Sequence, residues 1–266
     1  MSREHETEIE IRAPREAVWR ALADADELAK WFVDEARIES REGGTYWRSF
    51  GEGLGSDARI EAWEPERRLR VVNAPVTEPD AAEKVWHLER EAEPMVEEYF
   101  LETRGDVTAL RVVQSGIPDS PEWDGFYEGT RRGWRIAFTG LRFYLEHHRG
   151  EPRQRSSIQL ATPLPQDSAW DRLLACFAVR GDAGDRYRTH APDGTSLEGE
   201  ILIAIPEYGV LASVANLSNA LLALRTQATA KDTMVWLILT TYGAKPALSP
   251  TQEAAWRSAL ESAIAA

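Results

Sequence analysis

One stretch near the middle of the chain constrains the fold more than any other. It runs from Asp119 to Arg149 and opens on Ser120, a suitable N-cap, with Pro121 at the first helical position. Its large apolar side chains recur at spacings that place them on one side of a helix: Trp123, Tyr127, Trp134, Phe138, Leu141 and Leu145. The stretch therefore predicts a long amphipathic helix whose apolar side must be covered by another layer of the protein.

The residues before this helix provide that layer as a series of short strands. An alternating, β-branched segment at Thr7–Arg12 predicts the first strand, and two short helices follow, one beginning at Pro14 and one spanning Asp24–Lys30. Further strands are predicted at Arg37–Ser40, Thr45–Phe50, Ala58–Trp63, Leu69–Asn73, Lys84–Arg90, Met95–Glu102 and Thr108–Ser115. Residues 1–148 thus predict an α+β domain in which antiparallel strands curl around a terminal helix.

The second half of the chain repeats this order of elements. Three residues recur at one spacing near the start of each half, as Pro14, Trp19 and Leu22 and again as Pro165, Trp170 and Leu173. Strands are predicted at Ser157–Leu160, Arg186–His190, Leu197–Ile205, Gly209–Ala215, Ala220–Gln227 and Thr233–Tyr242. A capping box at Ser249 opens the last helix. We therefore predict a polar linker at 149–156 and a second, degenerate copy of the fold at 157–266.

Charge and composition narrow the classes of function. The net charge is −13, and residues 1–150 hold 32 acids against 21 bases, so the chain should repel nucleic acid. No apolar run reaches the roughly 18 residues that span a bilayer, and the N-terminus lacks an apolar signal core, so we expect a cytoplasmic protein. The single cysteine, Cys176, excludes an intramolecular disulfide, and the scattered histidines favour no metal site. We expect neither a metal nor a cofactor.

The candidate binding residues lie on the sides of the strands and the long helix that should face each other. Alternation along two neighbouring strands places one mostly apolar set of side chains inward. The predicted ligand-binding residues are Trp86, Glu97, Tyr99, Leu101, Leu110, Val112, Gln114, Trp134 and Phe138. This lining is typical of an apolar pocket and equally of a filled core. Glu97 is the exception, since a carboxylate there must reach solvent, pair with an arginine or serve as a polar group in a pocket.

Several sequence segments of the first half resemble those of a known superfamily. The matching segments are Ile9–Leu22, Leu28–Phe32, Gly43–Tyr46, Ile60–Leu69 and Thr108–Val112, together with Gly133, Trp134, Leu141 and Tyr144–Glu146 in the long helix. They resemble the START-like (SRPBCC) superfamily, in the branch named after the activator of the heat-shock chaperone ATPase. The resemblance implies a helix-grip fold, a curved antiparallel sheet around a terminal helix, often with a hydrophobic cavity. No single set of catalytic residues serves this superfamily.

We consider three functions on this basis, of which the first is preferred and the other two are alternatives. The first is a non-catalytic binding protein that holds an apolar small molecule or lipid between the sheet and the helix of the first domain. The second is a co-chaperone-like module that docks on a protein partner such as a chaperone ATPase. The acidic first half could then bind a basic surface of that partner. The third is a cyclase or hydrolase with Glu97 or His87 as its base.

Overall fold

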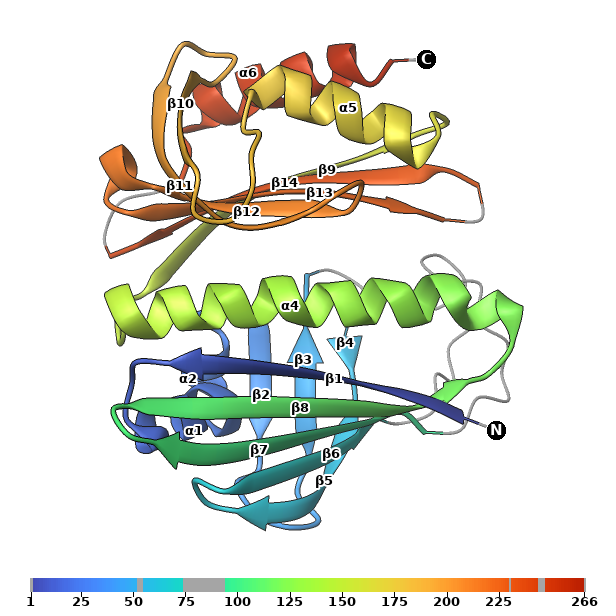
Figure 1. Ribbon diagram of the computed structural model, residues 1–266, viewed down its shortest axis with the longest axis vertical. Helices are drawn as coiled ribbons and strands as arrows, with labels where there is room; N and C mark the ends of the chain where they lie inside the picture. The colour runs from blue at the N-terminus through green and yellow to red at the C-terminus, as the bar shows by residue number, and fades with distance from the viewer. Residues whose placement is uncertain (1, 52–54, 74–93, 230, 244–246, 266) are drawn as a thin grey trace. The chain divides into compact units, whose positions relative to one another are not determined.

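The computed structural model divides the chain into two compact units, Met1–Gly150 and Glu151–Ala266 (Figure 1). It describes residues 2–51, 55–73, 94–229, 231–243 and 247–265. The strand predicted at Lys84–Arg90 lies outside the described residues. No helix in the described part of the chain is long and apolar enough to cross a membrane.

In its described residues the first unit consists of two antiparallel sheets, two short helices and one long helix. Its elements are β1 (Ser2–Ile11), α1 (Arg15–Ala23), α2 (Ala25–Leu28), β2 (Glu35–Ile38), β3 (Tyr46–Ser49), β4 (Gly55–Ser56), β5 (Ala58–Glu64), β6 (Arg68–Asn73), β7 (Val96–Arg104), β8 (Val107–Pro118), the 3-10 turn η1 (Pro121–Trp123) and α4 (Asp124–His147). Five strands pair in the order β1-β8-β7-β6-β5, and three more in the order β2-β3-β4. A bridge between Thr45 and Arg59 connects the two sheets. Bulges in β1 and β5 bend the strands, which helps the sheet to curve.

Helix α4 lies along the sheet, as its amphipathic pattern predicts (Figure 1). Trp134, Phe138, Leu141 and Leu145 are all buried. The predicted start is confirmed in position, since Ser120 is the N-cap and Pro121 the first residue of the turn, but this first turn is the 3-10 turn η1 and Ser120 makes no side-chain capping bond. Trp123 is buried there with Ile117 and Phe126, and this small cluster accounts for the tighter turn.

The second unit repeats the topology of the first. Its elements are β9 (Arg153–Thr162), α5 (Gln166–Phe177), β10 (Arg186–His190), β11 (Ser196–Ile205), β12 (Gly209–Val214), the 3-10 turn η2 (Ala215–Leu217), β13 (Ala220–Ala228), β14 (Thr233–Tyr242) and α6 (Pro250–Ala263). The six strands pair in the order β10-β11-β12-β13-β14-β9. In each unit the first strand therefore pairs with the last strand, and a terminal helix follows.

The three residues shared by the two halves have the same role in both. Pro14 and Pro165 each occupy the N-cap of the first helix of their unit. The tryptophan and the leucine that follow are buried in both copies: Trp19, Leu22, Trp170 and Leu173. The second unit closes with α6, which is shorter than α4 and begins at the predicted capping box on Ser249. The tandem arrangement expected from the sequence is confirmed.

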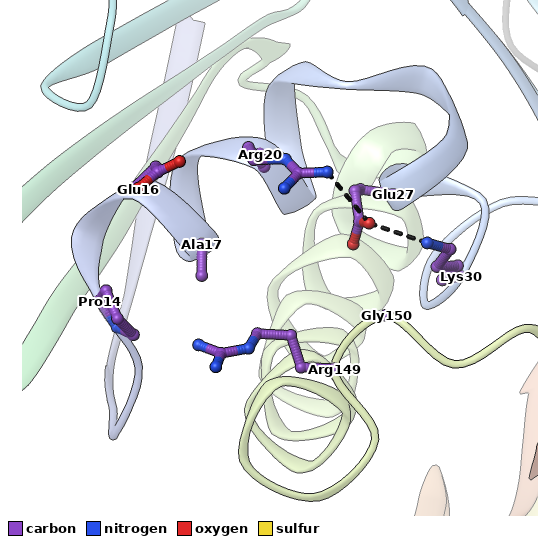
Figure 2. Close-up of a pocket in the computed structure, with 8 residues that line it drawn as sticks. All are labelled: Pro14, Glu16, Ala17, Arg20, Glu27, Lys30, Arg149 and Gly150. Carbon is purple, nitrogen blue, oxygen red and sulfur yellow. Dashed lines mark hydrogen bonds and ion pairs between the residues drawn. The ribbon is translucent and has the colours of Figure 1, made fainter.

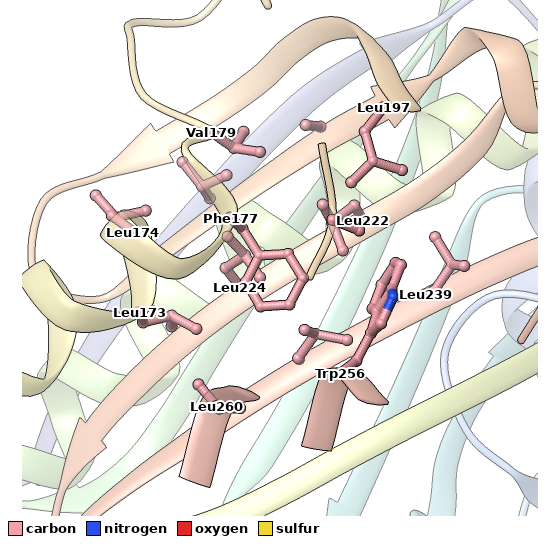
Figure 3. Packing of buried hydrophobic residues seen from close by; sticks show 14 of the residues in the cluster. Leu173, Leu174, Phe177, Val179, Leu197, Leu222, Leu224, Leu239, Trp256 and Leu260 are labelled. Atoms are coloured by element: carbon pink, nitrogen blue, oxygen red, sulfur yellow. The ribbon is translucent and has the colours of Figure 1, made fainter. Parts of the chain in front are cut away.

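Helices α5 and α6 cover one face of the second sheet with an apolar core (Figure 3). Trp256 of α6 lies against Phe177 of α5 in an edge-to-face arrangement, with the ring centroids 5.4 Å apart and the planes at 62°. Leu222 and Leu224 of β13 and Leu239 of β14 contribute to the same cluster. The apolar periodicity of both helices is satisfied within this unit.

The segment predicted as a linker is shorter in the structure. Strand β9 begins at Arg153, so residues 153–156 are paired with β14, with Arg153 opposite Tyr242 and Ser156 opposite Leu239. Their polar composition suggests a linker, but β9 is an edge strand, and one side of an edge strand tolerates polar residues. The long strand β14 provides the backbone partners that extend it.

Candidate functional site

The predicted ligand-binding residues converge inside the first unit. Eight of the nine lie in the described part of the chain, and all eight are buried: Glu97, Tyr99, Leu101, Leu110, Val112, Gln114, Trp134 and Phe138. The ninth, Trp86, lies outside the described residues, as does His87.

The register of β7 and β8 explains this convergence. Glu97 is paired with Gln114, Tyr99 with Val112, and Leu101 with Leu110. Directly opposite residues on antiparallel strands point to the same face of the sheet. The two alternating sets predicted from the sequence are therefore cross-strand partners, and they face α4.

Trp134 is the centre of an aromatic group on this face. Its ring stacks on that of Phe32, with the ring centroids 5.5 Å apart, and makes an edge-to-face contact with Tyr99 at 5.8 Å between centroids. The ring of Phe138 lies tilted against it, with the centroids 5.4 Å apart. The indole Nε1 donates a hydrogen bond to Oε1 of Gln114 at 2.8 Å. Gln114, an unexpected amide in an apolar set, thus satisfies the only polar atom of the indole side chain.

Glu97 pairs with an arginine that the sequence analysis did not select. Nη1 and Nη2 of Arg48 donate to the two carboxylate oxygens of Glu97 at 2.7 and 2.9 Å. The Tyr99 hydroxyl donates to the same carboxylate at 2.7 Å, and Nδ2 of Asn73 donates at 3.4 Å. Arg48 is 4% exposed and Glu97 is 6% exposed, so this is a buried bidentate ion pair.

The electrostatics of this cluster keep both partners charged. Burial by itself would raise the pKa of Glu97, but the charge of Arg48 and the hydrogen bonds to the carboxylate outweigh it and lower the pKa. Burial would likewise lower the pKa of Arg48, and the Glu97 carboxylate raises it instead. Burial, together with the Glu97 charge, holds the pKa of the Tyr99 hydroxyl well above its usual value. A carboxylate in this setting is a weak base, so the geometry does not favour Glu97 as a catalytic base.

A sequence signal for Arg48 exists, although it is a weak one. Tyr46 and Arg48 alternate along β3, and both are buried on its inward side. The Arg48 guanidinium lies over the Tyr46 ring, 5.3 Å from the centroid, and the Tyr46 hydroxyl donates to the backbone oxygen of Leu22 at 2.7 Å. An inward position for Tyr46 therefore implies an inward Arg48. Arginine is rarely buried without a partner, and for this reason it was not expected in an apolar set.

His5 is a second buried polar residue next to this group. Its Nε2 lies 3.0 Å from Oγ1 of Thr130, and its Nδ1 has no hydrogen-bond partner among the described residues. Burial and the nearby Arg131 lower its pKa, while Gln114 and Glu128 offset part of that shift. The ring is therefore held in its neutral form within the folded protein.

The protein is expected to lose stability as the pH falls through the ordinary histidine range. The pKa of His5 is lower in the folded state than in the unfolded state, so the unfolded chain binds the extra proton first. The stabilisation is present above the unfolded value, near 6.5, and is lost as the pH falls towards the folded value. Thermal unfolding of the wild type and of His5→Gln between about pH 5 and 8 tests this. The variant should show a flatter profile, and the exposed His190→Gln should match the wild type; identical profiles for all three would exclude the effect.

The described residues include no group of three or more histidine, cysteine, aspartate or glutamate side chains placed to hold a metal ion. The predicted site residues instead form a group of contacting aromatic rings beside a buried ion pair.

A curved antiparallel sheet that clasps a terminal helix, with an inward aromatic and polar lining, defines a helix-grip protein of the START-like (SRPBCC) class. Residues 12–146 match the family of activator of Hsp90 ATPase homolog 1-like proteins, and the chain belongs to this family. No curated protein matches the chain in sequence.

Several solved structures resemble the chain. Protein MLL2253 from Mesorhizobium loti is 25% identical, with a TM-score of 0.46, over 55% of this chain and 98% of that one. DynU16, a protein from the dynemicin biosynthetic locus, is 17% identical, with a TM-score of 0.45, over 98% and 95% of the two chains. The di-domain ARO/CYC protein BexL of the BE-7585A pathway is 16% identical, with a TM-score of 0.45, over 90% and 85%.

Proposed function

We propose that the first unit binds an apolar, ring-bearing small molecule or a lipid between its sheet and α4, with Arg48 as the polar contact. One observation carries the proposal: Nε of the buried Arg48 has no hydrogen-bond acceptor among the described residues. Buried polar groups in proteins are nearly always paired, and an unpaired donor costs about 1–3 kcal/mol. A ligand oxygen at this position would satisfy the donor.

The energetics of the ion pair support the same view. Burying two charges costs about as much as their attraction returns, so stability alone gives little reason to keep such a pair. Here the guanidinium of Arg48 lies over the ring of Tyr46, and the carboxylate of Glu97 accepts a hydrogen bond from the Tyr99 hydroxyl. A small number of placed polar groups within an apolar lining is the usual composition of a ligand site.

A series of contacting aromatic rings runs from this site to the protein surface. Phe50 is 42% exposed, and its ring meets the edge of the half-buried Phe32 at 5.2 Å. Phe32 in turn stacks on the buried Trp134. Phe50 is the one large apolar side chain exposed among the described residues. We propose that these three rings guide an apolar ligand from solvent into the site.

The proposal is tested by native mass spectrometry and thermal-shift measurements on the full chain with a panel of fatty acids, phospholipids and fused-ring aromatic compounds. At least one compound should give a bound mass and raise the unfolding midpoint. Phe32→Leu, which removes a ring on the path, should weaken binding about two- to tenfold, the typical value of one aromatic contact.

Phe100→Leu is the matched control, because Phe100 lies on the same sheet next to inward-facing Tyr99 but packs under Arg111 on the opposite face. Its affinity should equal that of the wild type. If no compound in the panel gives a bound mass or a thermal shift, the proposal is wrong.

A further inference from the structure

A second candidate site lies on the first unit, away from the aromatic interior. It is a pocket of about 640 Å³ formed by α1 and its N-cap, by Glu27 of α2 and the nearby Lys30, and by the segment after α4 (Figure 2). None of the residues proposed above for the apolar ligand lines it. Ligand binding in this pocket can therefore be tested independently of the proposed function.

The lining is rich in charge, and most of its charge is positive. Three cations and two carboxylates face the pocket: Arg20, Lys30 and Arg149 against Glu16 and Glu27. One positive charge is left over, within a half of the chain that carries 32 acids and 21 bases. The net charge of this pocket therefore has the opposite sign to the net charge of the half of the chain around it.

The carboxylate of Glu27 is already used by its neighbours. It is 9% exposed, accepts a hydrogen bond from Lys30 at 2.8 Å and another from the Tyr144 hydroxyl at 2.8 Å. The backbone N–H of Gly150 donates to that hydroxyl at 3.0 Å, which anchors the segment after α4 to α2. Lys30 and Glu27 thus neutralise each other and form one fixed wall of the pocket.

Arg20 and Arg149 make weaker interactions with neighbouring side chains than Lys30 does. Arg20 reaches Glu27 only at 3.5 Å, and its side chain is 58% exposed. Arg149 is exposed and forms no ion pair with a described residue; its guanidinium extends across the pocket towards Pro14 and Ala17 of the opposite wall (Figure 2). Both guanidinium groups therefore have donors available for a ligand.

We propose that this pocket binds the anionic group, a phosphate or a carboxylate, of a small organic molecule. Guanidinium groups present several donors in a plane that matches the oxygens of such anions. Arg20 and Arg149 contact the anion, and Pro14 and Ala17 contact the apolar part of the molecule. Because the net charge of the chain is −13, long-range attraction of anions is weak, so saturable binding requires a local site of this kind.

The test is isothermal titration calorimetry on the full chain with three probes: inorganic phosphate, phenyl phosphate and benzoate. Saturable binding by at least one probe is expected, and it should weaken as the salt concentration rises. Binding by both phosphates but not by benzoate assigns the site to phosphates, and the reverse result assigns it to carboxylates. Tighter binding of phenyl phosphate than of inorganic phosphate would show the apolar contact.

Arg149→Gln and Arg20→Gln should each reduce the affinity about tenfold, the value of one charge-assisted hydrogen bond. Both side chains are largely exposed, so the thermal midpoints of these variants should stay close to that of the wild type. Arg135→Gln on α4 is the control, since it removes the same charge from an exposed position outside the pocket. The proposal is overturned if no probe binds saturably, or if all three variants bind as the wild type does.

Discussion

Replacing Glu97 with glutamine is expected to lower the free energy of unfolding by about 3–5 kcal/mol, because it leaves the Arg48 charge buried without a counter-charge. Glutamine keeps the size of the side chain, so the loss reports the charge and not a cavity. Urea unfolding of the full chain at neutral pH measures it. The same pair adds stability that is present above the ordinary glutamate pKa and is lost as the pH falls through the lowered pKa of the folded state.

Two further variants separate this effect from general damage to β7. Glu102→Gln removes a carboxylate from the same strand, but Glu102 is exposed and pairs with Arg104 at the surface, so a change below about 1 kcal/mol is expected. The double variant Arg48→Met/Glu97→Met removes both charges and should recover most of the loss. If Glu97→Gln costs no more than Glu102→Gln, the ion pair is not buried in solution.

The second large effect is expected from Trp256→Ala in the second unit, which should cost about 3–5 kcal/mol. Trp256 is 0% exposed, packs against Phe177 and donates from Nε1 to the carboxylate of Asp193 at 2.9 Å. The substitution leaves a large cavity between α5, α6 and the sheet (Figure 3). It also removes one of the hydrogen bonds that tie the β10–β11 turn to α6, another being donated by Gln252 to Thr195.

Differential scanning calorimetry of the full chain measures this change. Trp256→Phe should be less damaging than Trp256→Ala, because it keeps most of the apolar volume and loses the hydrogen bond. Ser262→Ala in the same helix is the control, since Ser262 is exposed and a change within about 0.5 kcal/mol is expected. A loss from Trp256→Ala as small as that of Ser262→Ala would mean that α6 does not close the core.

Local patterns were sufficient for most of the fold. The strands Arg186–His190 and Thr233–Tyr242 have the predicted bounds, since alternation and the flanking turns define both ends. One boundary was wrong because a long-range pairing decided it: β9 starts at Arg153 because residues 239–242 of β14, far along the chain, offer a partner, and no local pattern reports that pairing. At the long helix the 3-10 first turn packs Trp123 against its near neighbours Ile117 and Phe126, a detail of turn geometry that the helical spacing does not specify.

In the candidate interior site, too, local patterns predicted some features and only the structure showed the others. Period-two alternation in β7 and β8 and the helical spacing of Trp134 and Phe138 were enough to predict which side chains face inward. Glu97 was left with three possible environments, and the structure shows the pairing with Arg48, which lies 49 residues earlier in the chain. That choice depends on how far the sheet curves and which strands it brings together.

The sequence by itself therefore determined which residues of each strand and helix face the interior. It also determined that the order of elements occurs twice. Only the tertiary structure decided the partners, among them Arg48 with Glu97 and Gln114 with Trp134, and it alone placed Arg20 and Arg149 around one pocket. The physical reason is that a face follows from the rotation per residue within one element, whereas a contact depends on the register and the curvature that relate different elements.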